Sequence, residues 1–80
     1  MESKLKVYGA KTCRDTLRAR KFLEENNVPY AWIDVDEDPI ALDLIRSVNN
    51  GQRTTPTIFF EDGSIQFEST NAQLAEKLGL

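Results

Sequence analysis

The spacing of apolar residues changes along the chain between the two-residue period of strands and the wider period of helices. The first apolar strand centres on Val7 and Tyr8 and is broken by Gly9. Apolar positions then recur at helical spacing from Cys13 to about residue 26, and Thr12 is the expected N-cap. The stripe of this helix consists of Thr16, Ala19, Phe22 and Leu23. The chain is therefore predicted to open with a strand and a helix that carries a cysteine in its first turn.

The rest of the chain continues this alternation. Residues 30–35 suit a central strand, and Asp38 followed by Pro39 predicts the start of a second helix that ends at residues 49–51. Its expected buried stripe is Ile40, Ala41, Leu44, Ile45 and Val48. Residues 57–60 and 65–67 are predicted to be strands joined by a hairpin turn at residues 61–64. Ser69 or Thr70 is the expected cap of a last helix, which should face the sheet with Ala72, Leu74, Ala75 and Leu78.

The predicted element order is βαβαββα. Strand–helix–strand units pair their strands in parallel through right-handed crossovers, and the late hairpin adds an antiparallel edge. We expect a single α/β domain over residues 1–80 with a thioredoxin-like fold, a four-stranded mixed sheet and three helices. In such a fold Cys13 lies at the carboxyl end of the sheet, where open α/β folds place their sites.

Composition removes several kinds of chemistry. The chain has no histidine and one cysteine, which excludes Cys-His catalysis, an internal disulfide and the usual soft-ligand zinc site. Its net charge of -3 argues against general nucleic-acid binding. No stretch approaches the ~18 consecutive apolar residues of a membrane span, and the N-terminus lacks the apolar run of a signal peptide. We expect a cytoplasmic protein that performs thiol chemistry or binding.

Cys13 is the candidate reactive group. The N-terminus of a helix favours a thiolate over a thiol, and Lys11 and Arg14 add positive charge on either side. The pKa of Cys13 is therefore expected to lie below that of a free cysteine. The alternative is that a single cysteine is simply a small buried apolar residue.

Three stretches of this chain resemble the glutaredoxin family, and the resemblance covers nearly its whole length. They are the junction between the first strand and Cys13, residues 34–39, and residues 47–51 leading into Thr54-Thr55-Pro56-Thr57. Residues 60–64 and Ser69-Thr70-Asn71 are most similar to the mycoredoxin-like branch. The resemblance implies that Cys13 is the attacking thiolate, that Pro56 is a cis-proline facing it, and that the backbone of Thr55 pairs with an incoming thiol.

Two positions depart from the family pattern. Many members carry a second cysteine three residues after the first, whereas this chain has Thr16 there, in a Cys-x-x-Thr motif. Its hydroxyl is expected to donate to the Cys13 sulfur, to pack in the core, or both. Glutathione-specific members usually have a Gly-Gly pair where this chain has Gln66-Phe67-Glu68. The identity of the small thiol therefore stays open among glutathione, mycothiol and bacillithiol.

The resemblance implies a thiol–disulfide oxidoreductase with a monothiol mechanism. Its co-substrate would be a small thiol, with no tightly bound cofactor and no metal, and its clients would be S-thiolated proteins. We expect a monomer in which the small thiol contacts Lys11, Arg14, Thr55, Ser69 and Thr70, although the last two are equally well explained as helix caps. The alternatives are a module that binds or transfers an iron–sulfur cluster with small-thiol ligands, and a redox-silent interaction domain.

Overall fold

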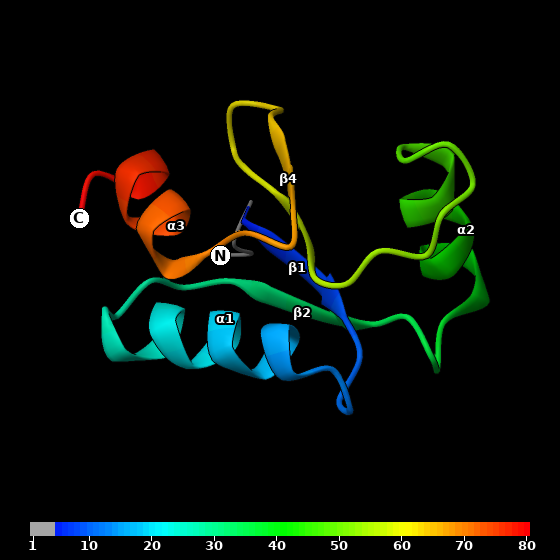
Figure 1. Ribbon diagram of the computed structural model, residues 1–80, viewed down its shortest axis with the longest axis horizontal. Coiled ribbons are helices and arrows are strands. Elements are labelled where there is room, and N and C mark those ends of the chain that lie inside the picture. Colours follow the sequence, from blue (N-terminus) through cyan, green and yellow to red (C-terminus); the bar gives the residue numbers. More distant parts are fainter. Residues whose placement is uncertain (1–4) are drawn as a thin grey trace.

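In a computed structural model of the chain, which describes residues 5–80, one sheet and three helices make up the fold (Figure 1). The elements are β1 (Lys6–Gly9), α1 (Arg14–Glu25), β2 (Ala31–Asp34), α2 (Pro39–Ser47), β3 (Thr57–Phe59), β4 (Ile65–Phe67) and α3 (Asn71–Leu78). The predicted element order is confirmed. Within the described residues, no helix is long and apolar enough to cross a membrane.

The sheet is mixed, with strand order β2-β1-β3-β4. β1 pairs in parallel with β2, whereas β3 runs antiparallel to both β1 and β4. Gly9 does not break β1 as predicted but ends it, opposite Asp34 of β2. The fold is the expected thioredoxin-like one, and both β1 and β2 bring their carboxyl ends to the edge of the sheet where α1 begins.

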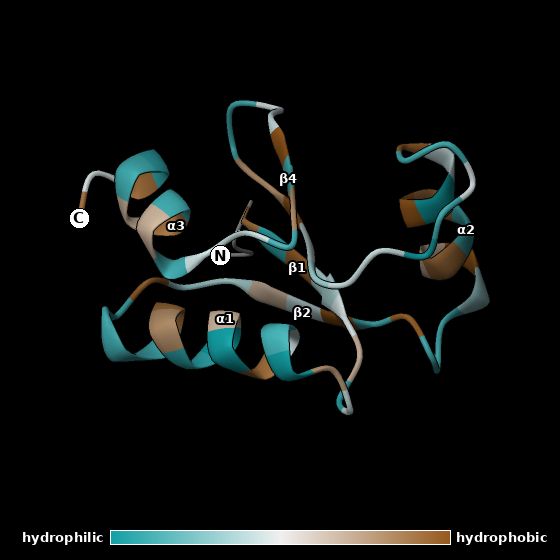
Figure 2. Cartoon of the chain, viewed as in Figure 1, coloured by the Kyte–Doolittle hydropathy of each residue, from teal (hydrophilic) through white to brown (hydrophobic). Residues whose placement is uncertain are grey.

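Each face of the sheet has its own apolar core. Val7 and Ile58 point toward α1 and α3, where they pack with Leu23 and Leu74. Tyr8, Val35, Ala41 and Ile45 form the core under α2 on the other face. Figure 1 shows the corresponding arrangement of the helices, and Figure 2 shows that apolar and polar residues alternate around their turns.

The predicted stripes of α2 and α3 are too wide. Ile40 is 81% exposed and Leu44 39% exposed, so α2 fully buries only Ala41 and Ile45. These two residues are four apart, which is the spacing of a single narrow contact line on a short helix. On α3 only Leu74 is fully buried, and Ala72 is exposed.

The predicted N-cap of α2 is confirmed, and of the two residues predicted for α3 one is the cap. The N-cap of α1 differs from the prediction. The Asp38 carboxylate accepts from two N–H groups of α2, and Thr70 rather than Ser69 caps α3 through a capping box with Gln73. The N-cap of α1 is Cys13 itself, because its extended backbone precedes the helix and its carbonyl accepts the Leu17 N–H at 3.0 Å. The thiol therefore lies at the N-cap of α1, one position before the first-turn position that was predicted for it.

Candidate active site

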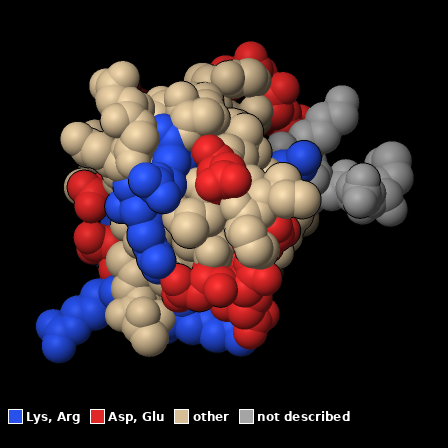
Figure 3. Space-filling model, turned by 90° about the vertical axis from the view of Figure 1, so that its right-hand side faces the viewer, with Lys and Arg blue, Asp and Glu red and all other residues tan. Residues whose placement is uncertain are grey.

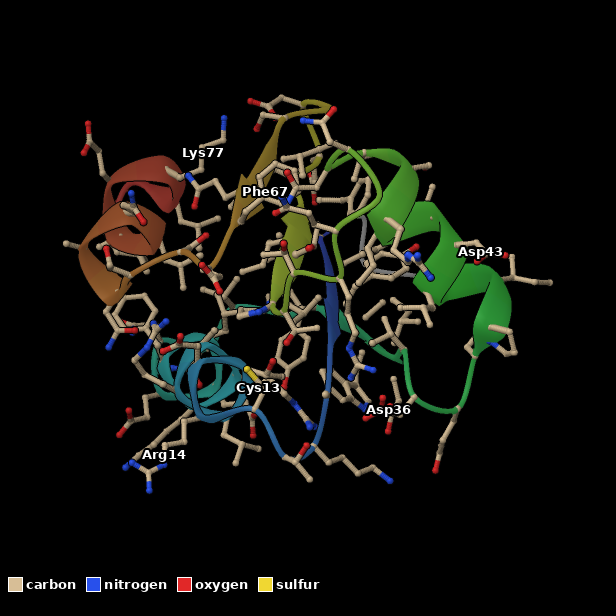
Figure 4. The ribbon with its side chains drawn as sticks, turned by 45° about the vertical axis from the view of Figure 1, so that its right-hand side comes forward. Cys13, Arg14, Asp36, Asp43, Phe67 and Lys77 are labelled. Carbon is tan, nitrogen blue, oxygen red and sulfur yellow. The ribbon has the colours of Figure 1, made fainter. Side chains whose placement is uncertain are left out.

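Cys13 is a partly exposed thiol that faces the loop before β3 (Figure 4). Its Sγ donates to the carbonyl oxygen of Thr55 at 3.5 Å. The Thr55–Pro56 peptide bond is cis, as the resemblance implies. The fold thus brings Cys13 together with a loop that lies 42 residues away in the sequence.

A tight turn places the thiol here. The Cys13 N–H donates to the Ala10 carbonyl at 3.1 Å, and the Ala10 N–H donates to the Thr16 hydroxyl at 3.5 Å. Thr16 is completely buried beneath the turn, and its side chain packs directly on Gly9. Three predicted site residues, Cys13, Thr16 and Thr55, therefore meet at one point.

The pKa of Cys13 is lowered, in the predicted direction. Burial raises the pKa of the thiol, but the Thr16 hydroxyl, the Thr55 side chain and the N–H groups of Thr16 and Asp15 outweigh burial by stabilising the thiolate. The two N–H groups belong to the first turn of α1, so the expected effect of the helix N-terminus is present.

The two cations expected to stabilise the thiolate are not among the groups that lower this pKa. Lys11 lies 3.8 Å from Asp34 and 3.6 Å from Glu37, and Arg14 extends away from the Cys13 sulfur (Figure 4). Hydrogen bonds rather than these charges lower the pKa of Cys13.

The surface near Lys11 carries a further ion pair, between Arg53 and Asp36 at 2.6 Å. Figure 3 shows the mixed basic and acidic surface of this side of the molecule.

Replacing Thr16 by valine is expected to move the midpoint of Cys13 alkylation to higher pH. Valine keeps the buried shape but cannot donate to the sulfur, so the pKa of Cys13 rises and less thiolate is present at pH 7. The hydrogen bond of a hydroxyl to an anion predicts a rate at pH 7 that is lower by roughly threefold to tenfold. Iodoacetamide alkylation measured against pH checks this. Thr16→Ser, which keeps the hydroxyl, should retain most of the wild-type profile, and a Thr16→Val profile that superimposed on it would refute the role of Thr16.

The side chains of Ser69 and Thr70 are already occupied within the protein. Ser69 is completely buried and its hydroxyl donates to Gln66 at 2.7 Å, while the Thr70 hydroxyl accepts from the Gln73 N–H. A bound thiol at this end of α3 would therefore meet backbone groups rather than these two hydroxyls.

Sequence reasoning missed a residue that ties α1 to this end of α3. Arg18 donates to the Asn71 side chain and to the Ser69 carbonyl, both at 2.6 Å, and lies 3.7 Å from Asp15. No sequence pattern could reveal it, because Ser69 and Asn71 are 51 and 53 residues away. Arg18 fixes the start of α3 beside the helix that carries Cys13.

Neither a metal cluster nor the main pocket coincides with the thiol in the described part of the chain. Residues 5–80 contain no group of three or more histidine, cysteine or acidic residues placed to hold a metal ion. A pocket lined by Leu5, Val28, Phe60 and Leu78 lies at the start of β1, whereas Cys13 follows its end. A hydrogen-bonded cysteine at a helix N-terminus facing a cis-proline is the site arrangement of thioredoxin-like thiol–disulfide oxidoreductases.

Comparisons with known proteins define the family within this class. The glutaredoxin family model matches residues 5–65, and the chain belongs to the glutaredoxin family. A Mycobacterium tuberculosis protein assigned to the glutaredoxins is 32% identical over 74 residues, which cover 92% of this chain and 88% of that protein. Mycoredoxin 1 of Corynebacterium glutamicum is 43% identical over 47 residues, or 59% of this chain and 56% of its own. The predicted glutaredoxin resemblance, including its mycoredoxin-like character, is confirmed.

Solved structures agree. The thioredoxin-like protein BC3987 superimposes with a TM-score of 0.79 at 27% identity, over 91% of this chain and 97% of its own. The glutaredoxin of Archaeoglobus fulgidus gives a TM-score of 0.80 over 95% of this chain and 86% of its own, and at 21% identity it shares the fold. Family and fold together support a thiol–disulfide oxidoreductase function in general terms, with a small thiol as co-substrate.

Proposed function

We propose that this glutaredoxin reduces mixed disulfides between proteins and a small thiol by a monothiol mechanism. The observation that carries the proposal is the residue three positions after Cys13, which is a buried threonine whose hydroxyl cannot form a disulfide. An enzyme with one thiol needs a second thiol from solution to complete a cycle.

Each catalytic cycle involves two small-thiol molecules, one bound to the client and one free in solution. Cys13 thiolate attacks the small-thiol sulfur of the client's mixed disulfide, so that a Cys13–small-thiol disulfide forms and the client leaves as a thiolate, which takes up a proton. A second small thiol, as its thiolate, then attacks the small-thiol sulfur on Cys13. This step releases a small-thiol disulfide and restores the Cys13 thiolate.

The residues around Cys13 would hold the small thiol in an extended conformation. The Thr55 backbone before Pro56 offers polar groups beside the sulfur, as its carbonyl lies 3.5 Å away. Lys11 and Arg14 would meet carboxylates, and the N-terminus of α3 near Ser69 and Thr70 would supply backbone N–H donors. Glutathione, mycothiol and bacillithiol are the candidate thiols, and a reducing cytoplasm would supply them to a monomeric enzyme.

The test compares two kinds of substrate. Purified protein should reduce a client carrying a mixed disulfide with glutathione, mycothiol or bacillithiol when the same free thiol is present, and the three rates of Cys13 adduct formation identify the co-substrate. An intramolecular disulfide of the insulin type should not turn over without added small thiol. Efficient turnover of the insulin-type disulfide without added small thiol would contradict the monothiol mechanism.

A further inference from the structure

Glu68 lies where the three elements of the site meet. Its N–H donates to the Pro56 carbonyl at 2.8 Å, so its backbone runs directly beside the cis-proline loop that Cys13 faces. The following residue, Ser69, is held through its carbonyl by Arg18 of α1, the helix that Cys13 caps. The glutamate is therefore anchored on both sides by groups that belong to the thiol site.

The backbone of Glu68 adopts a conformation that a side chain disfavours. Its φ angle is 52°, in the left-handed region where glycine is the usual residue. Non-glycine residues in this region cluster at functional sites. The side chain is exposed and makes no core contact that would explain it. A function for the carboxylate would explain why this position carries a glutamate.

The negative charge of Glu68 has no partner in the described part of the chain. Its carboxylate makes no ion pair or side-chain hydrogen bond within residues 5–80. Arg18, which binds the carbonyl of the next residue, also contacts Asn71 and Asp15. A ligand that enters beside the Thr55–Pro56 segment would meet an uncompensated carboxylate.

We propose that Glu68 is a specificity-determining residue that favours disulfides carrying a cationic group next to the attacked sulfur and disfavours those carrying a carboxylate there. The inference rests on the proposed function and names the chemistry of its substrate. Cys13 thiolate attacks sulfur S of a disulfide R–S–S–R′, the Cys13–S bond forms, and R′S⁻ leaves. R then lies against the Thr55 backbone, within the field of the Glu68 carboxylate.

Three small probes isolate charge from shape. Mixed disulfides of 2-thiopyridine with 2-aminoethanethiol, 2-mercaptoethanol and 3-mercaptopropionate place a cation, a neutral hydroxyl or a carboxylate at nearly the same distance from sulfur. Each reaction with Cys13 releases 2-thiopyridone, which is followed by its absorbance. The ratio of the cationic to the anionic rate constant measures charge selectivity, and it should be about fivefold lower in Glu68→Gln than in the wild type at low salt. High salt should reduce the difference.

Two further variants complete the experiment. Glu68→Gly, which suits the left-handed backbone, should give the same ratio as Glu68→Gln, so that a loop change specific to glutamine is recognised. Glu61→Gln removes an equivalent exposed charge from the turn at the other end of β4 and should leave the ratio unchanged. A ratio unaltered in both Glu68 variants, or altered equally by Glu61→Gln, would overturn the role of Glu68. A wild-type protein that reacts with every probe no faster than free cysteine would instead contradict the proposed function itself and, with it, this inference.

Discussion

Cys13→Ser is expected to abolish thiol–disulfide exchange, with a loss on the order of a thousandfold or more, down to the rate without protein. Cys13 is the only cysteine of the chain, so no other side chain can form the mixed disulfide with the small thiol. A serine hydroxyl in its place is not ionised near neutral pH and is not a nucleophile toward sulfur. Reduction of a glutathionylated, mycothiolated or bacillithiolated client, together with mass spectrometry of the adduct, measures the loss.

The serine variant should remain folded, which makes the result a statement about chemistry. The thiol is only partly buried and the core of each sheet face is formed by other residues, so circular dichroism and thermal unfolding should differ little from the wild type. Exchange that persists in a folded Cys13→Ser protein would rule out Cys13 as the attacking group.

The element order and much of the fold could be predicted because their signals are local. Asp38 before Pro39 is a cap that the next two residues complete, and the strands on either side of Gly63 carry their own turn between them. The number of residues that each helix buries could not be predicted from such local signals. Ile40 and Leu44 have helical spacing, but the short contact of α2 with the sheet leaves no neighbour to cover them.

The candidate site also combines features with a local sequence signal and features that depend on contacts between distant residues. The lowered pKa of Cys13 could be predicted from its place at a helix N-terminus. Lys11 and Arg14 were also expected to lower it, but they are not among its causes. Lys11 approaches acids at the end of β2, and only the parallel pairing of β1 with β2 brings them together. Arg18 and Glu68 each contact residues more than ten positions away, and adjacent sequence does not encode such contacts.

Gly9→Ala is expected to destabilise the protein and to weaken thiol activation together. A Cβ at residue 9 would lie 2.5 Å from the Thr16 methyl carbon and 2.7 Å from the Thr16 hydroxyl oxygen, distances at which something must move. Thr16 is completely buried and β-branched, so it cannot turn away freely. Overpacking of this kind costs about 1–3 kcal/mol of unfolding free energy, measured by urea denaturation. Because the displaced hydroxyl no longer serves the sulfur, the alkylation midpoint of Cys13 should also move to higher pH.

A second substitution separates this collision from a general effect of alanine at the end of β1. Serine at position 16 lacks the methyl carbon of the closest contact and, with one heavy atom fewer on Cβ, can rotate its hydroxyl away from residue 9. Gly9→Ala combined with Thr16→Ser should therefore recover a large part of the lost stability, although Thr16→Ser alone is mildly destabilising. Such non-additivity is the signature of two residues in direct contact. Additive losses in the double variant would show that glycine is needed at residue 9 for its backbone, and not for the space that Thr16 occupies beneath the thiol.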